Sequence, residues 1–154
     1  MIVQLSRGEA RLRVNYGGVC PMCEYRWYGR QSHDFKVAVV EGDWRCPSCR
    51  RETKMRRATH LTLTFPANGV ATQTFEAEAV CSPRDNFSRR EGRKVALRKL
   101  LEYQPGELIP VWGDPTTLPP STQRFSRSDR AALWRVVCPD LTVKATRMSN
   151  SASQ

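Results

Sequence analysis

The segment Cys20-Pro21-Met22-Cys23 recurs further along the chain as Cys46-Pro47-Ser48-Cys49, and this repeat decides how the N-terminal part of the protein folds. A gap of two residues lets both sulfurs of a pair reach one ion from a single tight turn. The proline after the first cysteine fixes φ and helps to leave the following backbone N–H groups pointing at the sulfurs. We therefore expect one structural zinc ion, bound by Cys20, Cys23, Cys46 and Cys49.

Other uses of four cysteines fit this sequence less well. Two disulfides are uncommon in the cytosol, and residues 1–14 carry charges where a secretion signal would be apolar. A redox CxxC pair would not need a second matching pair, and iron–sulfur clusters usually have other ligand spacings. Rubredoxin-type iron stays open, since it also uses four cysteines. Cys81 and Cys138 lie outside any CxxC pair, so we expect neither to bind metal.

Residues 13–52 resemble the zinc-ribbon family, in which two CPxC turns mounted on β-hairpins hold zinc. The resemblance implies a structural metal, in a fold that occurs in transcription and replication machinery and also as a purely structural element. Family members usually carry Gly after the second cysteine of each turn, where this chain has Glu24 and Arg50. Between the pairs, Tyr25, Trp27, Tyr28 and Phe35 either form the small core that a ribbon needs or stack on unpaired bases, and the core is favoured.

The middle of the chain predicts two strands and a helix. Residues 60–65 alternate apolar and polar side chains, and a turn leads to a second strand over residues 70–81. Helix formers follow from Ser88 to Tyr103, after residues suited to capping. We therefore expect a β-hairpin plus helix, a ββα unit, over residues 58–104. Its segment AVCSPRDNFSRREGR, residues 79–93, looks like part of small uncharacterised bacteriophage proteins, which implies a phage origin.

The predicted fold class is α+β. The zinc ribbon, with a further strand at residues 36–40, occupies residues 1–57, and the ββα unit follows it. A Pro-rich extension over residues 105–154 completes the chain, with a short helix near residues 130–137 and a disordered tail from residue 148. Because no stretch is long and apolar enough to span a bilayer, we expect a cytoplasmic protein without membrane contact.

The net charge of +10 is concentrated in two segments. Residues 45–57 and residues 84–99 each carry an excess of five positive charges, whereas charges elsewhere nearly cancel. Such clustering is expected of a surface that meets phosphates or an acidic protein. The candidate partner-binding residues are Arg45, Arg50, Arg51, Lys54, Arg56, Arg57, Arg89, Arg90, Arg93, Lys94, Arg98 and Lys99.

These features favour a zinc-stabilised nucleic-acid-binding protein, and with the phage resemblance they predict a phage-encoded regulator that acts on DNA, RNA or a transcription complex. The alternative is a modulator that binds an acidic host protein, such as RNA polymerase or a defence nuclease, through its basic surface. We expect no enzyme and no small-molecule substrate, because the sequence has two histidines, no clustered carboxylates and no Gly-rich phosphate loop.

Overall fold

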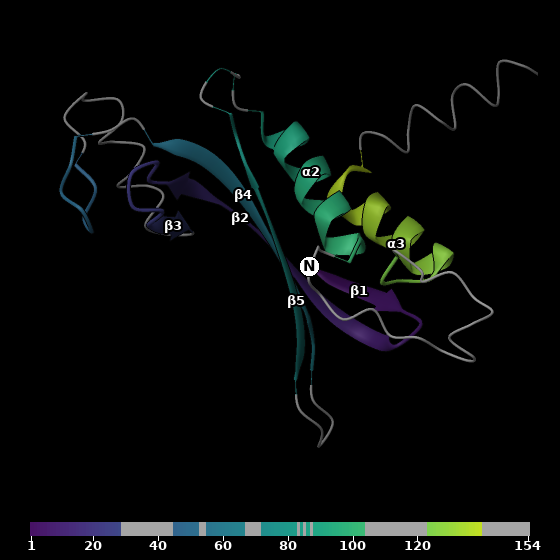
Figure 1. Ribbon diagram of the computed structural model, residues 1–154. Coiled ribbons are helices and arrows are strands. Elements are labelled where there is room, and N and C mark those ends of the chain that lie inside the picture. The colour runs from purple at the N-terminus through teal and green to yellow at the C-terminus, as the bar shows by residue number, and fades with distance from the viewer. Residues whose placement is uncertain are drawn as a thin grey trace, which may run out of the picture.

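The computed structural model describes residues 1–28, 45–52, 55–66, 72–82, 84, 86, 88–103 and 123–139. Within them the protein is an α+β fold in which an antiparallel sheet carries two helices on one face (Figure 1). The elements in chain order are β1 (Ile2–Leu5), β2 (Gly8–Val19), β3 (Arg26–Tyr28), β4 (Arg56–Phe65), β5 (Gln73–Val80), α2 (Arg89–Leu101) and α3 (Arg127–Val137). The predicted strand at residues 36–40 and the predicted tail lie outside the described residues.

Strand β2 organises the sheet. It pairs with β4 from Arg11 to Val19, and it pairs with β1 near its beginning and with β3 near its end. Strand β4 pairs in turn with β5. Since paired residues share a face, the helices cover the face that carries Leu12 and Leu63. The strands of the predicted ribbon and the predicted ββα unit thus lie in one sheet, while the division into domains at residues 57 and 104 stays a prediction.

Helix α2 lies within the predicted range of residues 88–103. Ser88 caps it, because the Ser88 hydroxyl accepts a hydrogen bond of 3.3 Å from the backbone N–H of Glu91. The buried stripe consists of Ala96, Leu97, Leu100 and Leu101, which face β4 and β5. Small Ala79 on β5 lets the helix approach the sheet closely.

Helix α3 begins three residues before its predicted start, because Ser126 is its N-cap and accepts a hydrogen bond from the Asp129 N–H. The Asp129 carboxylate is buried and accepts hydrogen bonds from the N–H and the hydroxyl of Ser6, at 2.7 and 2.5 Å. These bonds fix α3 to the turn between β1 and β2. Leu133 is buried, whereas Ala131 is exposed because it lies on the opposite side of the helix.

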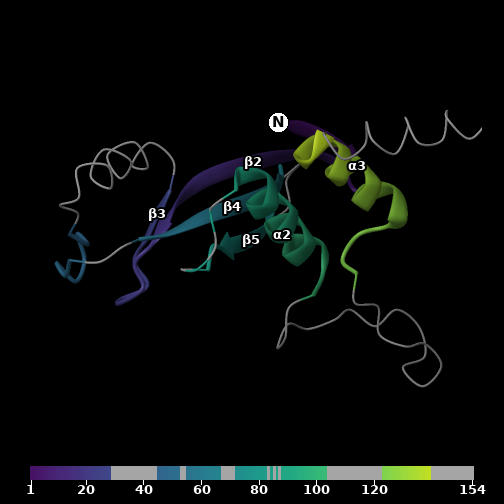
Figure 2. The ribbon, with the colours of Figure 1, turned by 90° about the horizontal axis from the view of Figure 1, so that it is seen from above.

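The described residues form two hydrophobic clusters. The larger one joins the sheet to both helices, and the smaller one surrounds Cys20, Cys46 and Met55. Figure 2 shows that the segment of residues 45–52 and α3 lie at opposite ends of the molecule. We refer to the end at which β2 stops, β4 starts and β5 stops as the cysteine end of the sheet. In the described part of the chain, neither helix is long and apolar enough to cross a membrane.

Candidate metal centre

The first cysteine turn is held between β2 and β3. Strand β2 ends at Val19, the turn follows at once, and β3 returns to pair with β2 from Gly17 opposite Tyr28 to Val19 opposite Arg26. The two strands approach so closely that a Cβ atom on Gly17 would lie 1.7 Å from the backbone oxygen of Trp27. A residue without a side chain is therefore required at position 17. The sequence analysis missed this role, although two adjacent glycines inside a strand were a signal for it.

The two cysteine turns have the same backbone hydrogen bonds. In each turn, the N–H of the residue directly after the second cysteine donates to the carbonyl of the first cysteine. The N–H of the first cysteine donates to the carbonyl of the residue two positions after the second cysteine. The four bonds are Glu24 N–H to Cys20 O at 2.9 Å, Cys20 N–H to Tyr25 O at 2.9 Å, Arg50 N–H to Cys46 O at 2.7 Å and Cys46 N–H to Arg51 O at 3.2 Å. The repeat in sequence is thus a repeat in backbone structure.

Glu24 and Arg50 adopt the backbone conformation that glycine favours. Their φ angles are +60° and +57°, both in the left-handed region. An L-residue with a side chain costs roughly 1–2 kcal/mol in that region. The backbone is therefore left-handed at both positions even though neither residue is glycine.

The four cysteine sulfurs lie close enough together to bind one ion. Cys20 Sγ is 3.8 Å from Cys49 Sγ, Cys23 Sγ is 3.5 Å from Cys46 Sγ, and all four lie within 4.8 Å of one another. A tetrahedral metal bound to sulfur at about 2.3 Å requires sulfurs about 3.8 Å apart. The predicted ligands are thus brought together in a group that could hold a metal ion.

The remaining cysteines lie elsewhere in the structure. Cys138 is buried at the C-terminal end of α3, and Cys81 follows β5. Among the described residues, the group that could hold a metal does not include either of them.

The pKa values of Cys23 and Cys49 are shifted in opposite directions. A hydrogen bond from the backbone N–H of Tyr25 lowers the pKa of Cys23 to about 6. The backbone N–H of Arg51 lowers the pKa of Cys49, but burial and hydrogen bonds to the three neighbouring thiols raise it to about 11. Four thiols this close resist losing all their protons, because the negative charges repel one another. A bound cation offsets that repulsion, so metal binding and proton release are coupled.

The aromatic residues near the cysteines belong to the protein interior and to the sheet. Tyr25 and Trp27 pack against the small cluster around Cys20 and Cys46, as expected of ribbon-core residues. The ring of Tyr28 stacks on His60 with 5.0 Å between centroids, and its hydroxyl donates a hydrogen bond to Glu78. Phe35 lies outside the described residues. Sequence reasoning did not find the contacts of Tyr28, because they join β3 to residues of β4 and β5.

The first basic segment surrounds the second cysteine turn and the start of β4. Arg45 forms an exposed ion pair with Glu52 at 3.1 Å, whereas Arg50 and Arg51 are exposed on the turn itself. Lys54 lies outside the described residues. Arg56 Nε donates to the carbonyl of Cys81 at 3.1 Å, and the Arg57 carbonyl accepts from the Cys81 N–H at 2.7 Å. The start of β4 therefore lies against the segment that leads into α2.

Most of the second basic segment lies in α2, where its charged residues have different surroundings. The Arg89 guanidinium lies 4.8 Å from the centre of the Tyr16 ring on β2. Glu91 pairs with Lys94 at 2.7 Å, and Lys99 Nζ donates to the Glu78 carbonyl at 3.0 Å. Arg90 and Arg98 are exposed, and Arg93 is half-buried.

The two basic segments meet at the cysteine end of the sheet. The Arg89 guanidinium lies over the ring of Tyr16. Tyr16 is paired with Thr59 of β4, and Thr59 is two residues from Arg57 in the same strand. The first turn of α2 is thereby placed over the beginning of β4. This meeting of segments that lie far apart in sequence could not be read from the charge pattern.

Searches among known protein families, characterised proteins and solved structures found no match to this chain.

Proposed function

We propose that Cys20, Cys23, Cys46 and Cys49 hold a structural zinc ion as in a zinc ribbon. Support comes from the all-sulfur donor set, the separations of 3.5 and 3.8 Å between sulfurs and the matching hydrogen bonds of the two turns. Zinc bound by four cysteines is a closed site that stabilises a fold and leaves no position for a substrate. Native mass spectrometry combined with metal analysis tests this assignment, and one iron ion per chain would contradict it.

We further propose that the protein binds nucleic acid at the cysteine end of the sheet. The observation that carries this proposal is the meeting of both basic segments there. Arg50, Arg51 and Arg90 are exposed and have no ion pair among the described residues, so their charges are available to phosphates. Each phosphate contact releases a condensed counterion, which makes the affinity fall steeply with salt. A phage-encoded regulatory role and the absence of catalytic activity stay predictions.

A salt series tests nucleic-acid binding. Replacing Arg50, Arg51 and Arg90 by Ala should flatten the log–log slope of affinity against salt by about 2.7 on duplex DNA, or about 2.1 on single strands, if all three contact phosphates. The control replaces Arg11, Arg127 and Arg135, three exposed arginines outside the two basic segments, by Ala. It removes the same charge and should leave the slope nearly unchanged.

Two results would contradict this proposal. One is no detectable binding to duplex or single-stranded probes even at low salt, which would favour the acidic-protein alternative. The other is an equal loss of slope in both triple variants, which would indicate attraction by net charge without a defined interface.

A further inference from the structure

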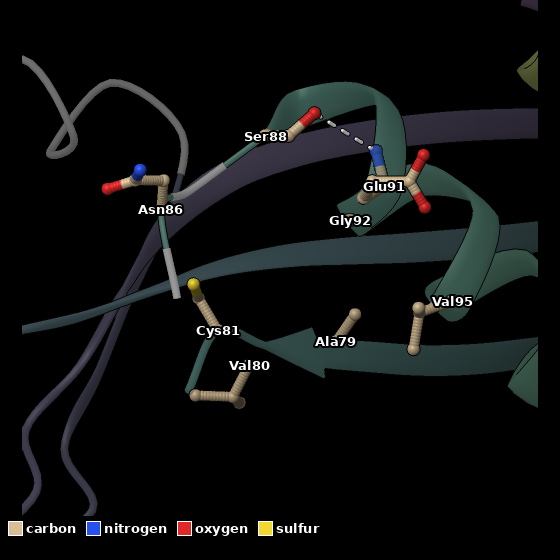
Figure 3. Close-up of a pocket in the computed structure, with 8 residues that line it drawn as sticks. All are labelled: Ala79, Val80, Cys81, Asn86, Ser88, Glu91, Gly92 and Val95. Carbon is tan, nitrogen blue, oxygen red and sulfur yellow. Dashed lines mark hydrogen bonds between the residues drawn. The ribbon is translucent and has the colours of Figure 1, made fainter. Parts of the chain in front are cut away.

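A pocket of about 270 Å³ lies between the end of β5 and the first turns of α2 (Figure 3). Ala79 extends from β5 toward the helix, and Val95 extends from α2 toward the strand, whereas Val80 points to the opposite face of the sheet. Gly92 has no side chain and leaves the space between them open. Val95 lines the pocket and is 41% exposed. The pocket is therefore an apolar recess that opens to solvent.

The same recess borders the outer edge of the sheet, where an incoming strand would take the place of Lys99 at the Glu78 carbonyl. Among the described residues β5 is the last strand of the sheet, paired on one side with β4. Lys99 Nζ donates to the Glu78 carbonyl, so that carbonyl points away from β4. Because N–H and C=O groups of one residue in an antiparallel strand point the same way, Glu78 and every second residue along β5 offer hydrogen-bonding groups at the outer edge. An apolar pocket beside such an edge suits an extended peptide better than a compact ligand.

The charge on the α2 side of this edge is positive in sum, because Glu91, which also lines the pocket, is paired with Lys94 at 2.7 Å. Lys99 lies on the groove side of α2 with Arg98 next to it in sequence, and both are exposed. The carboxylate of Glu78 lies on the opposite face of the sheet, where it accepts hydrogen bonds from Arg26 and Tyr28. A carboxylate on an incoming strand would therefore meet Lys99 and Arg98 without facing Glu78.

We propose that the groove between β5 and α2 binds an extended acidic peptide of a partner protein, which adds a strand to β5. The peptide residue beside Ala79 places an aliphatic side chain in the pocket. Side chains two residues apart in a strand share a face, so the residue beside Ala77 places its carboxylate near Lys99. The recognised feature is thus an aliphatic residue and an acidic residue two positions apart. A second copy of this chain fits less well, because pairing β5 with β5 would bring Glu76 and Glu78 of both copies together.

A peptide-display selection tests the proposal. Linear seven-residue peptides are selected on the full-length, metal-loaded protein and counter-selected on the Gly92→Leu variant, whose new side chain fills the pocket. Leu forms helices more readily than Gly, so this variant should fold and keep its melting temperature. Selected peptides should carry Val, Ile or Leu two positions from Asp or Glu. Fluorescence anisotropy should show affinity weakened at least about tenfold by Gly92→Leu and about tenfold by Lys99→Glu.

Arg90→Glu is the matched control, since it makes the same charge change on the opposite side of α2 from Lys99 and should leave peptide affinity within about twofold. No enrichment, enriched peptides without the aliphatic–acidic pair, or equal binding to the Gly92→Leu variant would overturn the proposal. A dimer dissociated by Gly92→Leu would assign the groove to a second copy. Competition by single-stranded DNA would assign it to nucleic acid.

This inference stands apart from the nucleic-acid proposal. Gly92→Leu should remove peptide binding and keep nucleic-acid binding, while the Arg50, Arg51 and Arg90 triple variant should do the reverse.

Discussion

The ring of Tyr28 lies against the backbone of Gly17, where a Cβ atom would come within 2.8 Å of Tyr28 Cδ1 and within 1.7 Å of the Trp27 oxygen. This contact fixes β3 on β2 directly after the first cysteine turn. Tyr28 in turn stacks on His60 of β4 and donates a hydrogen bond to Glu78 of β5. The position of the first cysteine pair relative to the sheet therefore depends on a residue without a side chain.

Gly17→Ala should displace β3 and lower the free energy of unfolding by about 3 kcal/mol, because the new methyl group overlaps backbone atoms that cannot move independently. It should also weaken metal binding, measured by competition with a chromophoric chelator. Gly8→Ala is the control: Gly8 has φ of +117° in the turn between β1 and β2, so alanine is strained there without touching the cysteine turns. Equal metal affinity of the two variants would refute the proposed role of Gly17.

Glu24→Gly and Arg50→Gly should each raise the melting temperature of the metal-loaded protein. Glycine relieves the left-handed strain at both positions but has a greater conformational entropy in the unfolded state. The net gain in the free energy of unfolding should be about 1 kcal/mol for each substitution. Thermal unfolding followed by circular dichroism measures the change. Glu24→Val should act in the opposite direction, because a β-branched side chain is the least suited to positive φ. A lower melting temperature for both glycine variants would show that the side chains contribute more than the backbone strain costs.

Removing the metal with a chelator should loosen the cysteine turns while the sheet and α2 stay protected. The small cluster around Cys20, Cys46 and Met55 buries little apolar surface, whereas the large cluster extends over both helices. Hydrogen–deuterium exchange should therefore accelerate at residues 20–28 and 45–52 much more than at residues 89–101. The Cys46→Ser variant should reproduce this pattern without chelator. Uniform loss of protection would mean that metal controls folding of the whole chain.

Replacing Cys81 and Cys138 together by Ala should leave metal stoichiometry unchanged, because neither belongs to the four-sulfur group. The variant should nevertheless lose about 1–2 kcal/mol of stability, since Cys138 is only 2% exposed and its sulfur fills space beside α3. Metal analysis of the purified variant gives the stoichiometry. Substoichiometric metal in a folded double variant would show that the ligand set is wrong.

Asp129→Asn should lower the free energy of unfolding by about 1–3 kcal/mol at pH 7, because an amide cannot replace a buried carboxylate that accepts hydrogen bonds from the N–H and the hydroxyl of Ser6. Burial raises the pKa of Asp129, but hydrogen bonds from the Ser6 side chain, the Ser6 backbone and Ser126 hold it below its usual value. The folded pKa is thus depressed. The stabilisation is therefore present above the unfolded pKa of about 3.9 and is lost as pH falls through the lower folded pKa.

Urea unfolding between pH 7 and pH 2 measures this dependence. The free energy of unfolding of Asp129→Asn should fall less between pH 7 and pH 2 than that of the natural chain. Ser126→Ala, which removes a helix cap, should keep most of this pH dependence because the hydrogen bonds from Ser6 remain. If the free energy of unfolding of the natural chain and of Asp129→Asn fell equally in acid, this carboxylate would be excluded as the titrating group.

The sequence by itself determined the local features of this protein. The two residues between paired cysteines are a covalent constraint, so the four-sulfur group could be predicted before any fold was known. The helix formers that begin at Ser88 predicted where α2 starts, although the N-cap is Ser88 itself and not one of the residues before it. The start of α3 was placed three residues late, although Ser126 is a suitable N-cap residue.

Only the tertiary structure decided which distant segments meet. The pairing of β2 with β4 brings Tyr16 beside Thr59, and α2 places Arg89 on that tyrosine. The contact of Tyr28 with His60 and Glu78 likewise joins three strands. Such contacts depend on strand register and helix packing, which are set by the collective burial of apolar side chains along the whole chain. The spacing of residues that are close in sequence does not predict such contacts. The meeting of the two basic segments at the cysteine end of the sheet, and the groove beside β5, are therefore visible only in the folded molecule.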